Sequence, residues 1–285
     1  MIPLTDDKIK TLTATANDIR QLIIKALLAA GSGHTAGPLG MADVFTLLYF
    51  HVLNHDPSRP DWPERDRLVL SNGHICPVLY ATMARAGYFS EDELLTLRQF
   101  GSRLQGHPHR DFLPALETSS GPLGSGLSQA VGMALAGRID NPTTGPFIFC
   151  LMSDAEQECG QTWEAAMLAG KEGLGNLIAI IDRNNIQIDG YTEEVMPLEP
   201  LAKKYEAWNW HVQEVDGHNF AELNDAIGAA KSVYERPSVI IANTIPGKGV
   251  KMFEKKYEWH GKPPTKAEGE AALRELQNLA NRIST

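Results

Sequence analysis

Residues 147–190 read FIFCLMSDAEQECGQTWEAAMLAGKEGLGNLIAIIDRNNIQIDG, and this stretch decides the fold. Two short apolar runs, at 147–152 and 177–181, are typical of buried strands, and a helix-length segment separates them. This pattern predicts two parallel neighbouring strands joined by a helix. The carboxyl ends of such strands meet at one edge of the sheet, which is where open α/β sheets bind ligands.

A carboxylate and an amide follow these two predicted strands. Asp154 lies just beyond the first strand and Asn184 just beyond the second. Both offer hard oxygen ligands of the kind that Mg²⁺ and Ca²⁺ prefer, and the backbone carbonyl of Ile186 could add a third. Taken alone, the pair is better explained as a helix cap and a turn residue. Together with the surrounding residues, it predicts a metal site that also binds phosphate oxygens.

The rest of the chain extends the α/β pattern. We predict strands at 68–70, 209–214 and 238–242, and helices at 6–30, 41–53, 90–100, 128–137, 161–172, 199–207, 219–233 and 268–283. Ser90 and Glu93 are spaced as a capping box, and residues 101–126 and 246–266 are rich in turn-forming residues. Alternating strands and helices indicate a parallel sheet with helices on both faces. We expect a single domain over 1–285 with an N-terminal helical portion, since no linker divides the chain.

The composition argues against several partners and locations. A net charge of −9 does not favour nucleic acid or an anionic membrane as the main partner. The three cysteines do not form the pattern of a disulfide framework, and they fit a reducing compartment. The first residues lack the apolar stretch of a signal peptide, and no apolar run approaches the length of a membrane span. We therefore expect a cytoplasmic protein.

Four histidines lie beside glycine at the ends of predicted elements: His34, His74, His107 and His260. Glycine allows the backbone to approach a ligand closely. One histidine in this setting means little, but four predict convergence on an anionic or hydroxyl-rich ligand. The other histidines are assigned no role: His51, His55, His109, His211 and His218.

The glycine-rich segment GPLGSG at 121–126 precedes a predicted helix. It reads equally as a loose phosphate loop or as a tight turn that lets the helix pack closely. It does not match the Gly-x-Gly-x-x-Gly pattern, and no clear strand precedes it. Both observations weigh against a dinucleotide-binding oxidoreductase.

Motifs along nearly the whole chain, taken in order, resemble transketolase. They are GSGH at 31–34 with GPLG at 37–40, DR at 66–67 with SNGH at 71–74, GHP at 106–108, GPLG at 121–124, the segment from Asp154 to Asn184, DGH at 216–218, and GKG at 247–249 followed by HG at 260–261. The resemblance implies the thiamine diphosphate-binding fold. It also implies a transferase that moves a two-carbon ketol unit from a ketose (phosphate) to an aldose (phosphate).

The resemblance implies roles for particular residues. The implied ligands of Mg²⁺ or Ca²⁺ are Asp154, Asn184 and the carbonyl of Ile186. The implied thiamine diphosphate site comprises His74, Gly121, Leu123, Asp154, Ala155, Glu164, Asn184, Ile188, Ile245 and His260. The implied channel to the reactive carbon, where side chains bind sugar hydroxyls and move protons, is lined by His34, His74, His107 and His260.

The family's pyrimidine-binding and C-terminal domains have no counterpart in residues 1–285. The resemblance therefore implies the N-terminal subunit of a split transketolase, which needs a C-terminal transketolase subunit in an α2β2 assembly. Ser153, Ala155 and Cys159 depart from the family pattern and leave open the alternative of a noncatalytic or regulatory subunit. A second alternative is the α subunit of another thiamine diphosphate enzyme, such as a 2-oxo acid dehydrogenase, although the four histidine motifs are not expected there.

Overall fold

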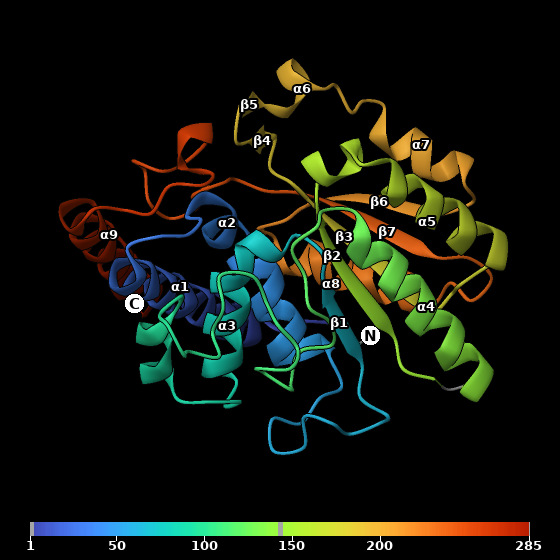
Figure 1. Ribbon diagram of the computed structural model, residues 1–285, viewed down its shortest axis with the longest axis horizontal. Helices are drawn as coiled ribbons and strands as arrows, with labels where there is room; N and C mark the ends of the chain where they lie inside the picture. Colours follow the sequence, from blue (N-terminus) through green and yellow to red (C-terminus); the bar gives the residue numbers. More distant parts are fainter. Residues whose placement is uncertain (1–2, 142–144, 285) are drawn as a thin grey trace.

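A five-stranded parallel sheet organises the computed structural model, which describes residues 3–141 and 145–284 (Figure 1). The strands lie in the order β1 (Arg67–Leu70), β2 (Ile148–Ser153), β3 (Leu177–Arg183), β7 (Ser238–Asn243) and β6 (His211–Asp216). The predicted pairing of the two apolar runs is confirmed, because Ile148 lies opposite Leu177 in a parallel register. Every residue of β2 and β3 is buried, which is why both read as continuous apolar runs.

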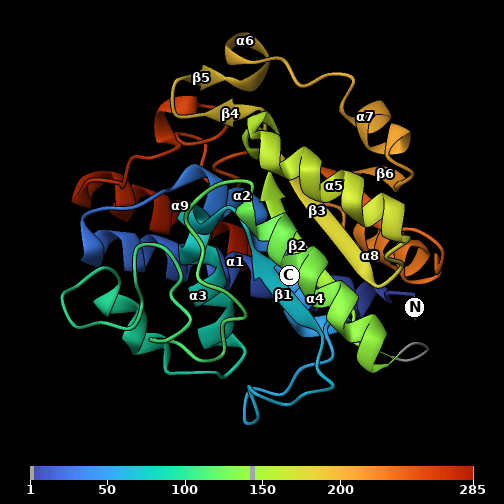
Figure 2. The same cartoon turned by 45° about the vertical axis from the view of Figure 1, so that its right-hand side comes forward.

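Helices cover both faces of the sheet, as predicted (Figure 2). One face carries α4 (Ser125–Asp140), α5 (Gly160–Glu172) and α7 (Leu201–Ala207). The other carries α1 (Asp6–Ala30), α2 (Ala36–Leu47), α3 (Cys76–Arg85), α8 (Phe220–Lys231) and α9 (Lys266–Ser284). Successive strand side chains point to opposite faces, so Phe149 packs in one core and Cys150 in the other.

The direction of the strand order reverses between β3 and β7. The chain steps from β1 to β2 to β3, then restarts at the far edge with β6 and returns through β7. Ligands bind open α/β sheets in the crevice outside the carboxyl ends at such a reversal. Asn184 follows β3 and Ile245 lies two residues beyond β7, so predicted site residues stand on both sides of the reversal.

Three predicted elements differ from the structure. The helix predicted at 41–53 already begins at Ala36, because Pro38 falls in the first turn, where its missing N–H has no helical partner. That helix ends at Leu47 and continues as a π-helix at Leu48–Val52. The helix predicted at 90–100 is a 3₁₀-helix, Glu91–Thr96, and the strand predicted at 209–214 begins at His211.

Local contacts explain the last two differences. The carboxylate of Glu93 pairs with the guanidinium of Arg103 at 2.6 Å, and the Ser90 hydroxyl accepts from Asp92 N–H, so the predicted capping box is not completed. Asn209 has a φ of 64°, a left-handed turn that separates α7 from the start of β6. The other predicted bounds shift by a few residues.

Several elements were not predicted. α3 follows directly on the 3₁₀-helix Gly73–Ile75, and Pro77 lies in its first turn. A small peripheral segment, visible at the edge of the molecule in Figures 1 and 2, contains β4 (Ile186–Gln187), β5 (Gly190–Tyr191) and α6 (Thr192–Val195). Residues 246–266 are largely irregular, as predicted, apart from a 3₁₀-helix at Tyr257–Trp259.

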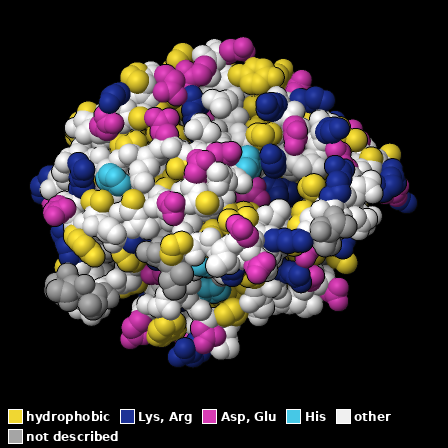
Figure 3. All heavy atoms as spheres, turned by 180° about the vertical axis from the view of Figure 1, so that it is seen from behind, with side chains coloured by type: hydrophobic (Ala, Val, Ile, Leu, Met, Phe, Trp, Pro, Cys, Tyr) yellow, Lys and Arg dark blue, Asp and Glu magenta, His cyan; other side chains and the backbone are white. Residues whose placement is uncertain are grey.

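The surface carries charges of both signs. Figure 3 shows acidic and basic side chains interspersed over one face of the molecule. None of the helices in the described ranges is both long enough and apolar enough to cross a membrane.

Candidate cofactor and metal site

Asp154 follows β2, is fully buried, and has two carboxylate oxygens that are held differently. Oδ2 accepts hydrogen bonds from Asn185 N–H at 2.7 Å and from the Arg183 guanidinium at 3.1 Å. Among the described residues, Oδ1 accepts one hydrogen bond, from Ala155 N–H at 2.7 Å. Burial raises the pKa of Asp154 to about 6, although the donors on Oδ2 act against this rise. Oδ1 is therefore the oxygen that retains capacity to bind a cation.

Asn184 lies just beyond β3, and both ends of its amide are fixed. Its Nδ2 donates to Asp182 Oδ2 at 2.7 Å, and its Oδ1 accepts from Ile186 N–H at 3.0 Å. A carbonyl oxygen has two lone pairs, so one remains on Oδ1. Asp182 also accepts a hydrogen bond from the Thr244 hydroxyl, which follows β7. Burial raises the pKa of Asp182 to about 7.

This donor set fits a metal ion that also binds phosphate oxygens. A carboxylate, an amide and a backbone carbonyl fill part of the oxygen shell that Mg²⁺ takes, and substrate phosphates usually supply more of it. Across residues 3–141 and 145–284, no three His, Cys, Asp or Glu side chains converge so as to hold a metal by themselves. Oxygen donors of these types suit Mg²⁺ or Ca²⁺ bound beside a diphosphate.

Three of the four singled-out histidines are in mutual contact. The ring centroids lie 4.8 Å apart for His34 and His74, 5.1 Å for His74 and His260, and 5.4 Å for His34 and His260. These rings come from the segment after α1, the segment after β1 and the segment after Tyr257–Trp259. Nδ1 of His34 is buried and has no hydrogen-bond partner among the described residues. A buried polar atom of this kind is costly unless a ligand or water meets it.

The histidines in contact are neutral at pH 7. Burial, followed by the nearby His260 and His107, lowers the pKa of His34 to about 4. Burial lowers the pKa of His260 to about 4 and that of His74 well below its ordinary value. A neutral imidazole has one donor and one acceptor nitrogen, so it can bind a hydroxyl and transfer a proton.

His107 belongs to the same neighbourhood through the glycine-rich segment 121–126. Its ring lies 3.9 Å from the position that a Cβ would take at Gly121, and its charge also lowers the pKa of His34 and His74. The segment itself is fixed to α5, since the carbonyl of Leu123 accepts a hydrogen bond from Gln161 at 2.7 Å. The structure thus places Gly121 beside one of the histidines and ties Leu123 to α5.

Ile245 is positioned by a histidine to which the sequence pattern assigned no role. The Ile245 N–H donates to Nε2 of His218 at 2.7 Å, and Nδ1 of His218 bonds to Asp43 at 2.7 Å. Asp43 is also paired with the buried Arg20 at 2.6 Å. His218 is therefore a half-buried link between α2 and the segment after β7.

Other predicted cofactor-binding residues lie in more open positions. Ile188 is 66% exposed between β4 and β5, and Glu164 is exposed on α5. Ala155, whose N–H bonds to Asp154, is not among the described non-glycine residues with a positive φ. The methyl group at this position, where the family pattern has glycine, therefore brings no left-handed strain.

Sequence reasoning assigned no role of their own to two charged residues beside the predicted metal ligand. The Arg183 guanidinium bonds to Asp154 and also to Glu193 at 2.6 Å and Glu199 at 2.9 Å. Glu156 is fully buried two residues beyond Asp154. Their signal in the sequence is only their place beside a predicted ligand, and their contacts follow from the tertiary structure.

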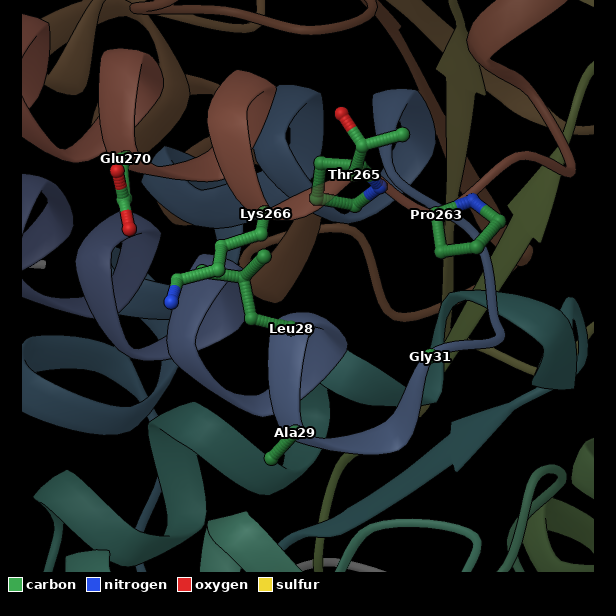
Figure 4. A pocket seen from close by; sticks show the side chains of 8 residues that line it. Leu28, Ala29, Gly31, Pro263, Thr265, Lys266 and Glu270 are labelled. Carbon is green, nitrogen blue, oxygen red and sulfur yellow. The ribbon is translucent and has the colours of Figure 1, made fainter.

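A cavity of about 630 Å³ lies between the end of α1 and the start of α9 (Figure 4). Its lining residues are Leu28, Ala29, Gly31, Pro263, Pro264, Thr265, Lys266 and Glu270. In Figure 4, Lys266 and Leu28 extend side by side, and Gly31 and Pro263 lie on the other side. No predicted site residue lines this cavity.

Known proteins resemble this chain along most of its length. Residues 11–279 match the family model described as the thiamine diphosphate binding domain of transketolase. The 6-deoxy-6-sulfo-D-fructose transketolase subunit SqwG of a Clostridium species is 45% identical over 263 residues, which are 92% of this chain and 94% of that protein. One of the subunits of the apulose-4-phosphate transketolase of Phocaeicola vulgatus is 37% identical, with 97% of each protein covered.

Full-length transketolases match over a smaller share of their length. The crystal structure of transketolase from Campylobacter jejuni aligns with a TM-score of 0.87 and 34% identity, covering 95% of this chain and 42% of that one. Transketolase 2 of Escherichia coli is 41% identical, and the match covers 38% of its length. These matches set aside the dinucleotide-binding and 2-oxo acid dehydrogenase alternatives. The chain belongs to the transketolase family and corresponds to its N-terminal, thiamine diphosphate-binding part.

Proposed function

We propose that this chain is the cofactor-binding subunit of a split transketolase and moves a two-carbon ketol unit from a ketose to an aldose. The observation that carries the proposal is a buried Asp154 whose Oδ1 retains binding capacity, together with a cluster of neutral histidines. The two are joined through Glu156, which accepts a hydrogen bond from Ser71, three residues before His74. A metal-diphosphate site and a proton-transferring surface thus share one edge of the sheet.

Thiamine diphosphate, when bound, supplies the carbon that takes up and releases the ketol unit. Asp154, Asn184 and the Ile186 carbonyl would hold Mg²⁺ or Ca²⁺ against its diphosphate, with the Ala155 N–H, His74 and His260 nearby. Leu123, Ile188 and Ile245 would pack its rings, and Gly121 would allow close approach. His34 and His107 would bind sugar hydroxyls and move protons, because a neutral imidazole both donates and accepts.

The proposal includes a partner and a class of substrate. The chain spans less than half of the full-length C. jejuni enzyme but nearly all of two relatives named as subunits. We place the pyrimidine-binding and C-terminal domains on a separate C-terminal subunit, in an α2β2 complex located in the cytoplasm. The names of these two relatives specify a sulfonated and a phosphorylated sugar, so we expect a sugar phosphate or a similar anionic sugar.

The test compares this chain alone with this chain plus its candidate C-terminal subunit. Ketol transfer from xylulose 5-phosphate to ribose 5-phosphate is measured with thiamine diphosphate and Mg²⁺, and then with 6-deoxy-6-sulfofructose or apulose 4-phosphate as donor. Activity that requires the mixture supports the split enzyme. Cofactor binding without transfer of any of these sugars would contradict the proposed substrate class.

A noncatalytic subunit remains the second candidate because Ser153, Ala155 and Cys159 replace residues usual in the family pattern. Isothermal titration of the complex with thiamine diphosphate and Mg²⁺ separates the two functions. Stable association with the C-terminal subunit but no cofactor binding would favour the noncatalytic one.

A further inference from the structure

The side chain of Glu156 ties together three parts of the molecule that come from distant positions in the chain. Its Oε1 accepts hydrogen bonds from the Ser71 hydroxyl and from Gly124 N–H, the latter at 2.5 Å. Its Oε2 accepts from Ser153 N–H at 3.2 Å. The Ser71 oxygen in turn accepts from Gly126 N–H at 3.0 Å. The end of β1, the end of β2 and the start of α4 therefore meet at one carboxyl group.

This carboxyl group is held by donors and not by a cation. Glu156 is fully buried, and none of the ion pairs in the described part of the chain involves it. Burying a carboxyl group with hydrogen bonds but no paired cation costs free energy, so its presence requires an explanation. The bonds to Gly124 and, through Ser71, to Gly126 satisfy N–H groups at the start of α4 that have no partner within that helix.

The contacts around these glycines leave little freedom for the segment. Gly124 has a φ of 83°, and a Cβ there would lie 2.9 Å from side-chain atoms of Cys159, Gln161 and Thr162. A Cβ at Gly126 would overlap the Cβ of Ser71. The start of α4 therefore packs directly on the end of β1. Loss of the carboxyl group would remove the acceptor that these buried N–H and O–H groups use.

We propose that Glu156 is a positioning residue that sets the part of the site for the cofactor rings relative to the part for the metal and diphosphate. This inference rests on the proposed function. Glu156 holds Gly124, which follows Leu123, and it holds Ser71, which leads into the turn bearing His74. It also stands two residues from Asp154. One side chain thus fixes the spacing between two groups of residues that must meet the same ligand at its two ends.

The test uses the assembled complex of this chain with its C-terminal subunit, together with two ligands of different length. Isothermal titration in Mg²⁺ is carried out with thiamine diphosphate, which reaches both parts of the site, and with inorganic pyrophosphate, which reaches the metal part. Glu156→Ala should weaken thiamine diphosphate binding by about 10- to 100-fold, the range for residues that orient a metal or cofactor site. Its affinity for pyrophosphate should stay at the wild-type value.

Three further variants make the test specific. Glu156→Gln keeps an oxygen for Ser71 and Gly124 but turns an amide toward Ser153 N–H, so it should recover most of the thiamine diphosphate affinity. Ser71→Ala, which remains useful should Glu156→Ala fail to fold, should lose about 2- to 10-fold, the value of one hydrogen bond. Glu158→Gln is the matched control, because Glu158 is exposed in the same segment and bonds to Gln187.

The two ligands distinguish the outcomes. Equal losses for both ligands, in step with a lower melting temperature of the cofactor-free complex, would show a purely structural role and overturn the inference. No loss for either ligand in Glu156→Ala would also overturn it. A wild-type complex that binds neither ligand would overturn the proposed function, and the inference with it.

Discussion

The two sides of the candidate site hold their polar groups in opposite ways. At the ends of β2 and β3, carboxylates are surrounded by donors, as with Asp154 between Asn185 N–H and Arg183. In the histidine cluster the rings contact one another, and Nδ1 of His34 has no partner in the described chain. The charged side is therefore ordered before a ligand arrives, whereas the histidine side keeps polar atoms available for one.

The largest expected effect is on the charged side. Asp154→Ala should weaken thiamine diphosphate binding in Mg²⁺ by more than about 100-fold, beyond the range for residues that only orient a ligand. The fold should survive, because Arg183 keeps its ion pairs with Glu193 and Glu199. Isothermal titration measures the affinity, and circular dichroism without cofactor checks the fold. Unchanged affinity would show that the metal site has been misplaced.

Arg183→Met tests whether the charged side depends on its internal cation. Asp154 is buried, and losing one partner of a buried ion pair costs about 3 kcal/mol of unfolding free energy. Urea unfolding without metal should show this loss, and added Mg²⁺ should restore part of it by supplying a cation to Asp154. Equal loss with and without Mg²⁺ would mean that Arg183 and the metal do not act on the same carboxylate.

The histidine side should make the free energy of unfolding depend on pH. The pKa values of His34 and His260 are about 4 in the folded chain against 6.5 in the unfolded one, so the unfolded chain binds more protons between these values. Their contribution to stability is complete above about pH 6.5 and is lost as the pH falls toward 4, by about 3 kcal/mol for each ring.

A variant with both histidines replaced by asparagine isolates this term. Asp154 and Asp182 have raised pKa values and favour the folded state as the pH falls, so the wild-type curve alone mixes two opposite effects. The difference in unfolding free energy between wild type and variant should shrink from pH 7 to pH 5. A constant difference would mean that these rings are not buried in the neutral form.

The smallest expected effect is at a surface ion pair, which serves as a reference for the other variants. Glu93 and Arg103 form an ion pair at the surface, with side chains 27% and 41% exposed. Glu93→Gln should change the unfolding free energy by about 0.5 kcal/mol or less, because solvent screens such pairs. It should leave cofactor affinity unchanged in the same titration. If Glu93→Gln lowered the unfolding free energy as much as Arg183→Met, exposure to solvent would not distinguish weak surface ion pairs from strong buried ones.

The sequence predicts the sheet well because burial leaves a direct pattern. β2 and β3 are apolar until their last one or two residues, so their pairing and the meeting of Asp154 with the segment after β3 could be derived. The four histidines stood out because each lies beside a glycine at the end of an element. These features depend on residues close together in the sequence.

Other features depend on partners that no local pattern reveals. α3 follows a tight turn that resembles loop sequence, and α2 begins at a Gly-Pro pair that usually marks a break. Glu156 and His218 act through residues 85 and 175 positions away, Ser71 and Asp43 respectively. Their types are compatible with a solvent-exposed surface, so only the tertiary structure shows that Glu156 is buried, that His218 is half-buried, and that both are hydrogen-bonded.

The packing of α1 against α9 has a consequence for how the chain folds during synthesis. Asn17 donates to the carbonyl of Leu276, a contact 259 positions apart in the sequence, and Leu276 is fully buried in the same core. At roughly 5–20 residues per second, the apolar face of α1 leaves the ribosome many seconds before α9 is made. α2 and α3 can cover part of α1 early, but the side of α1 that faces α9 stays uncovered until the last helix has been made.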